Sequence, residues 1–569
     1  MTSCKRSSLA SRHAVFPAAG IFVLSSSSFV AFRNPYRPRI GSVLLSILVA
    51  VFIIVSGNRT FWTKAATLMQ GQNIALTLLF VGLTAAFIAL FVSFSVKYMT
   101  KPLLILLIMI SAFASWFMDQ YGVIIDVEML QSAIDTTNAE AGHFLTPAFL
   151  LHLLLLGVLP SLAIAYVRIE HRPYLQKVKW NLAVILPALV VFLACTAAYS
   201  GTFFSLGREH HELFDTLNPI SPVAKAVKLV LRANSDQHIV VHPLGLDAHV
   251  VGTSAKPRVA VIIAGETARA ESFSLGGYQK ETNPELAKEN ITYFPHTSSC
   301  GTITEVSIPC MFSVYRRKEY SHRKGLETEN LLDVLGHAGI KTEWWDNNTG
   351  DKGVAKRTAY TPLFKSGNAT FCNNQECLDD ILLAQLDNWL DDVKSDSVLV
   401  LHQLGSHGPA YHLRYTEAFR KFTPDCQTAE FGRCSRDEII NAYDNTILYT
   451  DHFIATVIER LKQRQSQLAV SMLYVSDHGE STGEYGLYLH GTPYMVAPSQ
   501  QTHVPFLAWL GDDEEKQVDS ACLGRVAGNE YSHDNLFHTV LGMMRVETNV
   551  YQTALDVFAP CRGKNTSQS

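Results

Sequence analysis

Three apolar, β-branched runs in the second half of the chain each lead into side chains that can bind a metal ion. The runs and the residues after them are 258–264 before Glu266, 397–401 before His402 and His407, and 468–475 before Asp477 and His478. In an open α/β sheet, ligands bind beyond the carboxyl ends of the strands, so we expect these side chains to converge. Carboxylate and imidazole groups suit Zn²⁺. The pattern favours a metal site of the hydrolytic type over unrelated structural histidines.

A catalytic zinc needs one further position for the reacting oxygen, and Thr304 in the segment 300–312 could supply it. We expect Thr304 near the start of a helix, where zinc and the helix N-terminus would both favour an oxyanion and an incoming phosphate. Thr302 is the nearest competitor. The residues alone also leave three serines open, namely Ser298, Ser299 and Ser307.

Two further side chains could contact a phosphate. His490 follows His478 by twelve residues and could hold a phosphate oxygen or a second metal ion. Lys352 lies in the glycine-rich segment TGDKGV and could also hold a phosphate oxygen. Its residue type alone favours a solvated surface lysine.

The composition indicates that these residues belong to a partly membrane-embedded chain. Of 569 residues, 48% are hydrophobic and 17% are charged, against about a quarter charged in soluble domains. Residues 1–205 carry 14 Lys and Arg against 6 Asp and Glu, whereas the remainder carries 33 against 45. The acidic second half lacks the basic groove of a nucleic-acid-binding protein, so we expect no nucleic-acid partner. The composition also excludes a disordered chain and a small disulfide-rich protein.

Five apolar stretches in the first half are long enough to cross roughly 30 Å of hydrocarbon. They cover 40–56, 74–94, 103–118, 147–167 and 182–199. Lys and Arg concentrate before the first stretch, between the second and third, and between the fourth and fifth. The positive-inside rule therefore places the N-terminus in the cytoplasm and the second half outside it. We expect 14–32 to be a weakly structured extension, since a sixth span there would break this topology.

The loop between the third and fourth stretches holds five of the six acids in the first 205 residues and no Lys or Arg. Thr136 and Glu140 in this loop are four residues apart and would share a face if the segment were helical. One interpretation is a solvated loop or an interfacial helix. The other is a polar rim that receives the amine of a lipid headgroup.

Eight of the ten cysteines lie in the second half, and an even number in an oxidising compartment indicates disulfides. The three closely spaced pairs are Cys300 with Cys310, Cys372 with Cys377, and Cys426 with Cys434. Cys522 and Cys561 are a possible fourth pair. Zinc binding by these cysteines is the weaker alternative because no tandem CxxC motif occurs.

The second half alternates strand-like and helix-like patterns, which predicts an α/β domain with a mainly parallel sheet. Before it, the segment 223–232 is amphipathic and basic, as expected of a helix lying on a membrane surface. We therefore expect four parts. They are a cytoplasmic extension (1–39), a transmembrane domain (40–202), interfacial linker helices (203–256) and a catalytic domain (257–569).

Five long motifs resemble the lipid A phosphoethanolamine transferases, a family to which the mobile colistin-resistance enzymes are closely related. They are GETARAESFSLGGYQKETNP (265–284), SSCGTITEVSIPCMFS (298–313), LHQLGSHGPAYHLRY (401–415), YDNTILYTD (443–451) and SDHGESTGEYGLYLHGTPY (476–494). The likeness covers most of the chain from about Arg37 onward. It implies a bacterial inner-membrane protein with five α-helical spans and a periplasmic domain of the α/β alkaline-phosphatase/sulfatase-like fold.

The resemblance also implies roles for individual residues. It implies that the zinc ligands are Glu266, Thr304, Asp477 and His478. Thr304 would also be the nucleophile. It places His407 and His490 beside these ligands, where they would bind the donor or a second zinc. It also implies that Lys352 contacts the donor phosphate and that Thr136 and Glu140 lie in the headgroup pocket.

Two features depart from the family pattern. The family commonly has Cys on both sides of the lysine, as CKGVC, whereas this chain has Asp351 and Ala355. The rigidity of the Lys352 loop therefore does not carry over from the family. An Asn often precedes the pocket threonine by four residues, and here that position is Ser132.

Together these features predict a zinc-dependent transferase, acting as a monomer, with one zinc ion or two. Phosphoethanolamine would pass from phosphatidylethanolamine to Thr304 and then to a phosphate of lipid A, which lowers the negative charge of lipopolysaccharide and gives polymyxin resistance. The alternatives are a transferase acting on a core sugar or a periplasmic glucan, and a membrane-bound phosphatase or sulfatase. A membrane sensor or transporter is disfavoured, because no span carries the buried charges that transport tends to need.

Overall fold

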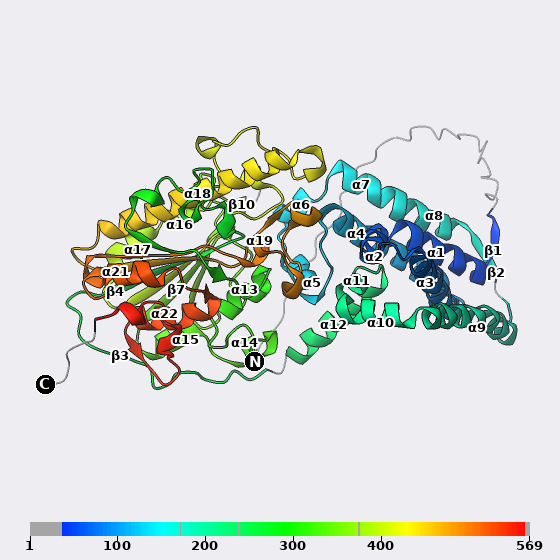
Figure 1. Ribbon diagram of the computed structural model, residues 1–569, viewed down its shortest axis with the longest axis horizontal. Helices are drawn as coiled ribbons and strands as arrows, with labels where there is room; N and C mark the ends of the chain where they lie inside the picture. The colour runs from blue at the N-terminus through cyan, green and yellow to red at the C-terminus, as the bar shows by residue number, and fades with distance from the viewer. Residues whose placement is uncertain (1–36, 171, 237–238, 374–375, 564–569) are drawn as a thin grey trace, which may run out of the picture.

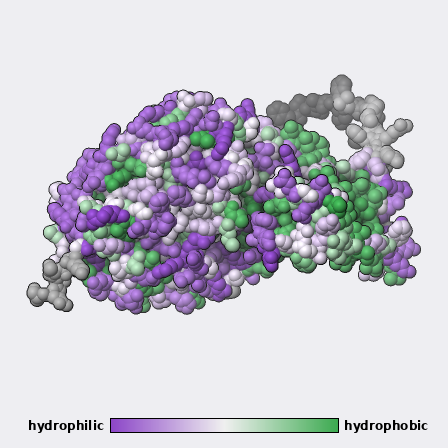
Figure 2. Space-filling view, in the orientation of Figure 1, coloured by the Kyte–Doolittle hydropathy of each residue, from purple (hydrophilic) through white to green (hydrophobic). Residues whose placement is uncertain are grey.

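The computed structural model describes residues 37–170, 172–236, 239–373 and 376–563, so the expected extension at 14–32 lies outside the described residues. An elongated helical part and an α/β part lie end to end (Figure 1). Hydrophobic residues cover much of the helical part, whereas hydrophilic residues dominate the visible surface of the α/β part (Figure 2). This division matches the contrast in composition between the two halves.

Four described helical runs are long and apolar enough to cross a membrane. They are α3 (Asn73–Ser93), α4 (Thr100–Tyr121), the run Pro147–Tyr166 and α9 (Tyr174–Ala198). These runs correspond to the second, third, fourth and fifth of the expected apolar stretches. The run Pro147–Tyr166 consists of α7 (Pro147–Leu153), a π-helical turn (Leu154–Val158) and α8 (Leu159–Tyr166).

The first expected span, 40–56, corresponds to a helix of 15 residues that ends at a bend. Helix α1 (Ser42–Ser56) is followed by α2 (Arg59–Leu68) at a bend of 60°, so a fifth span exists only if this pair counts as one. The Asn58 side chain donates to the Ile53 carbonyl at the end of α1 and to the Asn218 carbonyl of the later linker. The Ile53 carbonyl also accepts from the Gly57 amide, so the Asn58 side chain adds a bond at the end of α1 and ties the break to the linker.

Short helices connect the spans to the α/β part. They are α5 (Val127–Asp135), α6 (Asn138–His143), α10 (Ser200–Glu209), α11 (His211–Asp215) and α12 (Ile220–Asp236). Helix α12 contains the predicted amphipathic segment. Its side chains Val227, Val230 and Leu231 are 55–69% exposed, as expected of a helix with one face directed at lipid.

The α/β part is built on a seven-stranded sheet in the order β5-β15-β12-β4-β11-β7-β8. The strands in that order are Ile291–Phe294, Phe506–Leu510, Ala469–Ser476, Arg258–Gly265, Ser397–His402, Lys341–Asp346 and Ala359–Pro362. Strands β12, β4, β11, β7 and β8 pair in parallel, and β15 pairs antiparallel with both neighbours. The three predicted strands are thus β4, β11 and β12, adjacent at the centre of a mainly parallel sheet.

Helices cover both faces of this sheet (Figure 1). Along β4, Val259, Val261 and Ile263 belong to one core with α18 (Arg436–Lys462). Alternate residues of β4 face the second core, which contains α13 (Thr304–Met311), α15 (Leu331–His337) and α22 (Leu536–Met543). This alternation follows from the two-residue period of a strand, and its burial on both faces explains the continuous apolar run.

The described residues of the α/β part contain four disulfides. Three are the pairs expected from spacing, Cys300–Cys310, Cys372–Cys377 and Cys426–Cys434, and the fourth joins Cys522 to Cys561. Cys300–Cys310 joins the segment before Thr304 to the far end of α13. It therefore closes a covalent loop around the residue predicted to be the nucleophile.

Candidate active site

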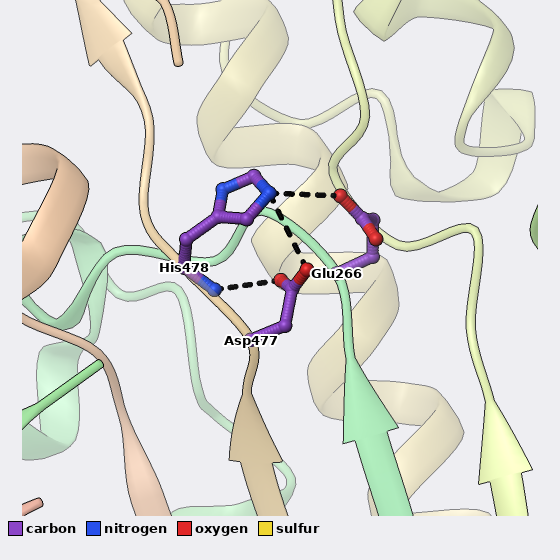
Figure 3. Close-up of side chains that lie close together, drawn as sticks. All are labelled: Glu266, Asp477 and His478. Carbon is purple, nitrogen blue, oxygen red and sulfur yellow. Dashed lines mark hydrogen bonds and ion pairs between the residues drawn. The ribbon is translucent and has the colours of Figure 1, made fainter. Parts of the chain in front are cut away.

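Two adjacent parallel strands bring three candidate metal ligands together. Glu266 follows β4, and Asp477 and His478 follow β12, with Gly265 and Ser476 paired in register. One ligand atom from each residue lies within 4.8 Å of the others, and all three residues are buried (Figure 3). The sequence prediction that these strand ends converge is therefore confirmed for β4 and β12.

Thr304 is the first residue of α13, and its hydroxyl lies in the same cluster. Its Oγ1 is 3.2 and 3.1 Å from the two Glu266 carboxylate oxygens and 3.4 Å from His478 Nε2. The competing hydroxyls have other partners. Thr302 donates to the Thr492 carbonyl. Ser298 donates to the Tyr531 carbonyl, and Ser299 donates to the Gly301 carbonyl. The Ser307 hydroxyl accepts from the Gly301 amide.

The third strand, β11, ends at His402, but the histidine that reaches the site is His407 in the loop after it. His402 at the end of β11 pairs through Nδ1 with Asp346 Oδ2 at 3.2 Å, so its expected place among the metal ligands was wrong. Asp346 is the residue of β7 that pairs with His402 in the sheet. After His402 the chain turns at Gly405, with φ of 53°, where a Cβ would lie 2.5 Å from the Glu266 carbonyl oxygen. Glycine thus allows the loop to pass close to Glu266 and bring His407 to the site.

The donor set fits a cation. Burial and the neighbouring Glu266 carboxylate raise the pKa of Asp477, and its Oδ2 lies 3.3 Å from His478 Nε2 but accepts no hydrogen bond among the described residues. Burial would also raise the pKa of Glu266, but His478 and His407 outweigh it and lower that pKa. Two buried carboxylates beside one imidazole and one hydroxyl form an oxygen and nitrogen set of the kind that binds zinc.

His407 and His490 lie beside this cluster. The His490 ring centroid is 4.4 Å from that of His478 and 5.3 Å from that of His407. Burial and the neighbouring His478 lower the pKa of His490, so its imidazole is neutral. Its Nδ1 lies 2.8 Å from Glu480 Oε2, and Tyr411 donates to the other oxygen of Glu480.

Glu480 received no role from the sequence, although it lies only two residues beyond His478. A carboxylate that orients an imidazole is common beside metal-binding histidines. No sequence pattern indicated that Glu480 faces His490, because the two residues come together only when β13 (Ser481–Thr482) pairs with β14 (Tyr488–Leu489).

Lys352 is buried, so the solvated lysine expected from its residue type was wrong. Its side chain is 6% exposed, and Nζ lies 2.8 Å from Glu305 Oε1 and 3.8 Å from Asp135 Oδ2. Burial would lower the pKa of Lys352, but Glu305 and Asp135 outweigh it and raise that pKa. In place of the family's flanking disulfide, the Ala355 amide donates to Asp351 Oδ2 at 2.6 Å.

A cavity of about 1010 Å³ lies between the helical part and the site. Its walls are mostly apolar side chains of α4, α7 and α12, and its polar lining includes Thr136, Glu140, His407 and His490. Thr136 directly follows the end of α5 and Glu140 lies in α6, so the two residues do not share the face of one helix. Both still line the cavity, and Glu140 Oε1 lies 3.4 Å from His407 Nε2.

Two family profiles match successive parts of the chain. The profile described as Phosphoethanolamine transferase EptA/EptB matches residues 83–233, and the Sulfatase profile matches residues 258–546. The phosphoethanolamine transferase EptA of Salmonella typhimurium is 38% identical over 92% of this chain and 98% of its own length. The phosphatidylethanolamine transferase Mcr-1 of Escherichia coli is 38% identical over 90% of this chain and 96% of its own.

Solved structures show the same arrangement. The integral membrane protein lipooligosaccharide phosphoethanolamine transferase A from Neisseria meningitidis is similar with a TM-score of 0.89 and 35% identity, over 92% of this chain and all of that chain. The soluble domain of that transferase matches with a TM-score of 0.56 and 43% identity, over 57% of this chain and 99% of that chain. The predicted fold class and location are confirmed: this is an inner-membrane protein with a periplasmic sulfatase-like domain. The chain belongs to the EptA/EptB phosphoethanolamine transferase family.

Proposed function

We propose that this protein transfers phosphoethanolamine from phosphatidylethanolamine to a phosphate of lipid A through a covalent intermediate on Thr304. The observation that carries the proposal is the cavity that connects membrane helices to His407 and His490 beside the buried cluster. A lipid with its acyl chains along the apolar walls could present its phosphate to Thr304. The names of relatives support the substrates, since the neisserial protein is a lipooligosaccharide phosphoethanolamine transferase and Mcr-1 a phosphatidylethanolamine transferase.

We propose that Glu266, Asp477, His478 and Thr304 hold a zinc ion. Bound there, zinc would supply positive charge that lowers the pKa of the Thr304 hydroxyl and offsets the charge of the reacting phosphate. One zinc suffices for these ligands, and His407 and His490 could serve a second. The Thr304 hydroxyl lies 3.1 Å from Glu266 Oε2, a hydrogen bond that would hold it at the metal site.

The first half-reaction forms a bond between Thr304 Oγ1 and the phosphorus of the donor. The bond from phosphorus to the glycerol oxygen breaks, and diacylglycerol leaves with the proton that the hydroxyl gave up. In the second half-reaction, a phosphate oxygen of lipid A attacks the same phosphorus, and the bond to Thr304 breaks as the hydroxyl regains a proton. Each half-reaction exchanges one ester or anhydride bond for another, as in other covalent catalysis.

The remaining site residues suit the zwitterionic headgroup. Lys352 Nζ and the His407 imidazole could donate to phosphate oxygens, whereas Glu140 offers a carboxylate to the ammonium group. Thr136 also lines the cavity. This arrangement favours the polar rim over the solvated loop as the interpretation of the acidic segment.

Mass spectrometry of lipid A from cells with and without the protein tests the proposal. One added phosphoethanolamine on a lipid A phosphate, absent with Thr304→Ala, is the expected result, together with a higher tolerance to polymyxin. Addition to a core sugar or glucan would identify a different acceptor. Release of free phosphoethanolamine without transfer would instead identify a hydrolase.

A further inference from the structure

The residue after Glu266 has an uncommon backbone conformation. Thr267 is fully buried, and its φ of 59° is in the left-handed region, which is costly for a β-branched side chain. Three contacts hold it there. The Thr267 amide donates to Asp477 Oδ1 at 3.0 Å, the Ala268 amide donates to Ser476 Oγ at 2.8 Å, and the Tyr443 hydroxyl donates to the Thr267 carbonyl at 2.8 Å. Such strain persists only where the surrounding contacts over-determine the conformation.

This turn aims the Thr267 hydroxyl back at the preceding side chain. Thr267 Oγ1 donates to Glu266 Oε1 at 2.5 Å. On the other side, Asn348 Nδ2 donates to Glu266 Oε2 at 2.7 Å and to the Gln403 carbonyl at 2.7 Å. Asn348 is 4% exposed, so water does not compete for these bonds. Each carboxylate oxygen of Glu266 therefore has one fixed donor besides the two proposed metal ligands near it, the Thr304 hydroxyl and, at 3.4 Å from Oε1, His478 Nε2.

We propose that Thr267 and Asn348 are positioning residues that fix the Glu266 carboxylate for zinc. The inference rests on the proposed function, because it assumes that Glu266 is a metal ligand. The two donors set the orientation of the carboxylate and stabilise its ionised form. A carboxylate oxygen has two lone pairs, so each oxygen keeps acceptor capacity for a cation. Partners that bind a metal ligand typically change metal affinity 10- to 100-fold when they are lost.

The variants separate the hydroxyl from the shape of the side chain. Thr267→Val keeps the β-branch, and with it the backbone strain, but removes the donor. Thr267→Ser keeps the hydroxyl. Asn348→Ala removes the second donor independently. Thr539→Val is the matched control, because Thr539 is a fully buried threonine in α22 whose hydroxyl accepts from the Val557 amide.

Zinc dissociation constants of the full-length proteins in detergent, measured by competition with a chelator, give the readout, alongside the melting temperatures of the zinc-free proteins. We expect Thr267→Val and Asn348→Ala to bind zinc about 10-fold or more weakly. Thr267→Ser and Thr539→Val should bind like the wild type, although Thr539→Val should melt earlier.

The measurements distinguish failure of the positioning role from failure of the proposed zinc site. If Thr267→Val and Asn348→Ala both keep wild-type zinc affinity, the positioning role is wrong. If Thr267→Val does not fold, the affinities of Asn348→Ala and Thr267→Ser still decide, and wild-type affinity of Asn348→Ala then overturns the inference. If the wild-type protein itself binds no zinc, the proposed metal site is wrong and the inference fails with it.

Discussion

Lys352 Nζ lies 2.8 Å from Glu305 Oε1, and Glu305 directly follows Thr304 at the start of α13. The buried lysine is therefore tied to the helix that carries the proposed nucleophile. On the other side, Asp135 of the helical part lies 3.8 Å away. The position of this ammonium group thus depends on both parts of the protein and on the turn that presents it.

Asp351→Ala should loosen that turn. The variant loses the acceptor for the Ala355 amide, at a cost of about 1 kcal/mol in folding stability. We expect the KM for phosphatidylethanolamine to rise more than kcat falls, because the proposed role of Lys352 is to bind the donor. Steady-state transfer with reconstituted protein measures both.

A cysteine pair provides the matched control for that turn. Combining Asp351→Cys with Ala355→Cys gives the arrangement common in the family and should restore a low KM under oxidising conditions. An Asp351→Ala variant with the wild-type KM would show that this bond does not position Lys352.

Thr304→Ala should abolish transfer and leave the fold and the bound zinc in place, since Glu266, Asp477 and His478 remain. With donor but no acceptor, the wild-type protein should accumulate one phosphoethanolamine on Thr304, detectable by peptide mass spectrometry. Thr302→Ala should act more mildly, because its hydroxyl bonds the Thr492 carbonyl. An adduct mapped to Thr302 or to a serine would refute the assignment.

Asp477→Ala should lose zinc. Asp477 Oδ2 lies in a buried site without a hydrogen-bond donor among the described residues, which a cation would compensate. Metal analysis of the purified variant against the wild type is the measurement. Asp451→Ala is a useful comparison, since this buried carboxylate accepts from the Glu285 and Leu286 amides away from the cluster. Full zinc occupancy in Asp477→Ala would exclude it as a ligand.

Glu376→Gln should remove an acid-sensitive component of stability. Burial alone would raise the pKa of Glu376, but the charge of Arg414 and the contact with His143 outweigh it and hold that pKa well below its ordinary 4.5. A carboxyl with a lowered folded-state pKa stabilises the protein above its unfolded-state value, and that contribution is lost as the pH falls below about 4.5 toward the folded-state value.

At pH 7 the same variant should be less stable by about 3 kcal/mol, because Arg414, whose side chain is 2% exposed, would lose its charge partner. Thermal unfolding at several pH values compares it with the wild type. Equal melting temperatures for both proteins at pH 7 would show that this pair contributes little.

Local patterns predicted the centre of the fold and of the site, and long-range contacts explain what they missed. The apolar runs located β4, β11 and β12 because a strand buried on both faces leaves a continuous signature. They could not show that His402 turns to Asp346 instead of the metal cluster. The burial of Lys352 depends on Glu305 and Asp135, which lie 47 and 217 residues away in sequence. The break after α1 likewise depends on Asn218, 160 residues from Asn58.

The cavity has apolar walls on membrane helices and a polar end at His407 and His490. Acyl chains along those walls would set how far a phosphate rises above the hydrocarbon before it meets Thr304. Substrate choice would then depend on height above the bilayer as well as on headgroup chemistry. A water-soluble phosphate ester has no such fixed height, so the same architecture that admits lipids would give it no preferred approach.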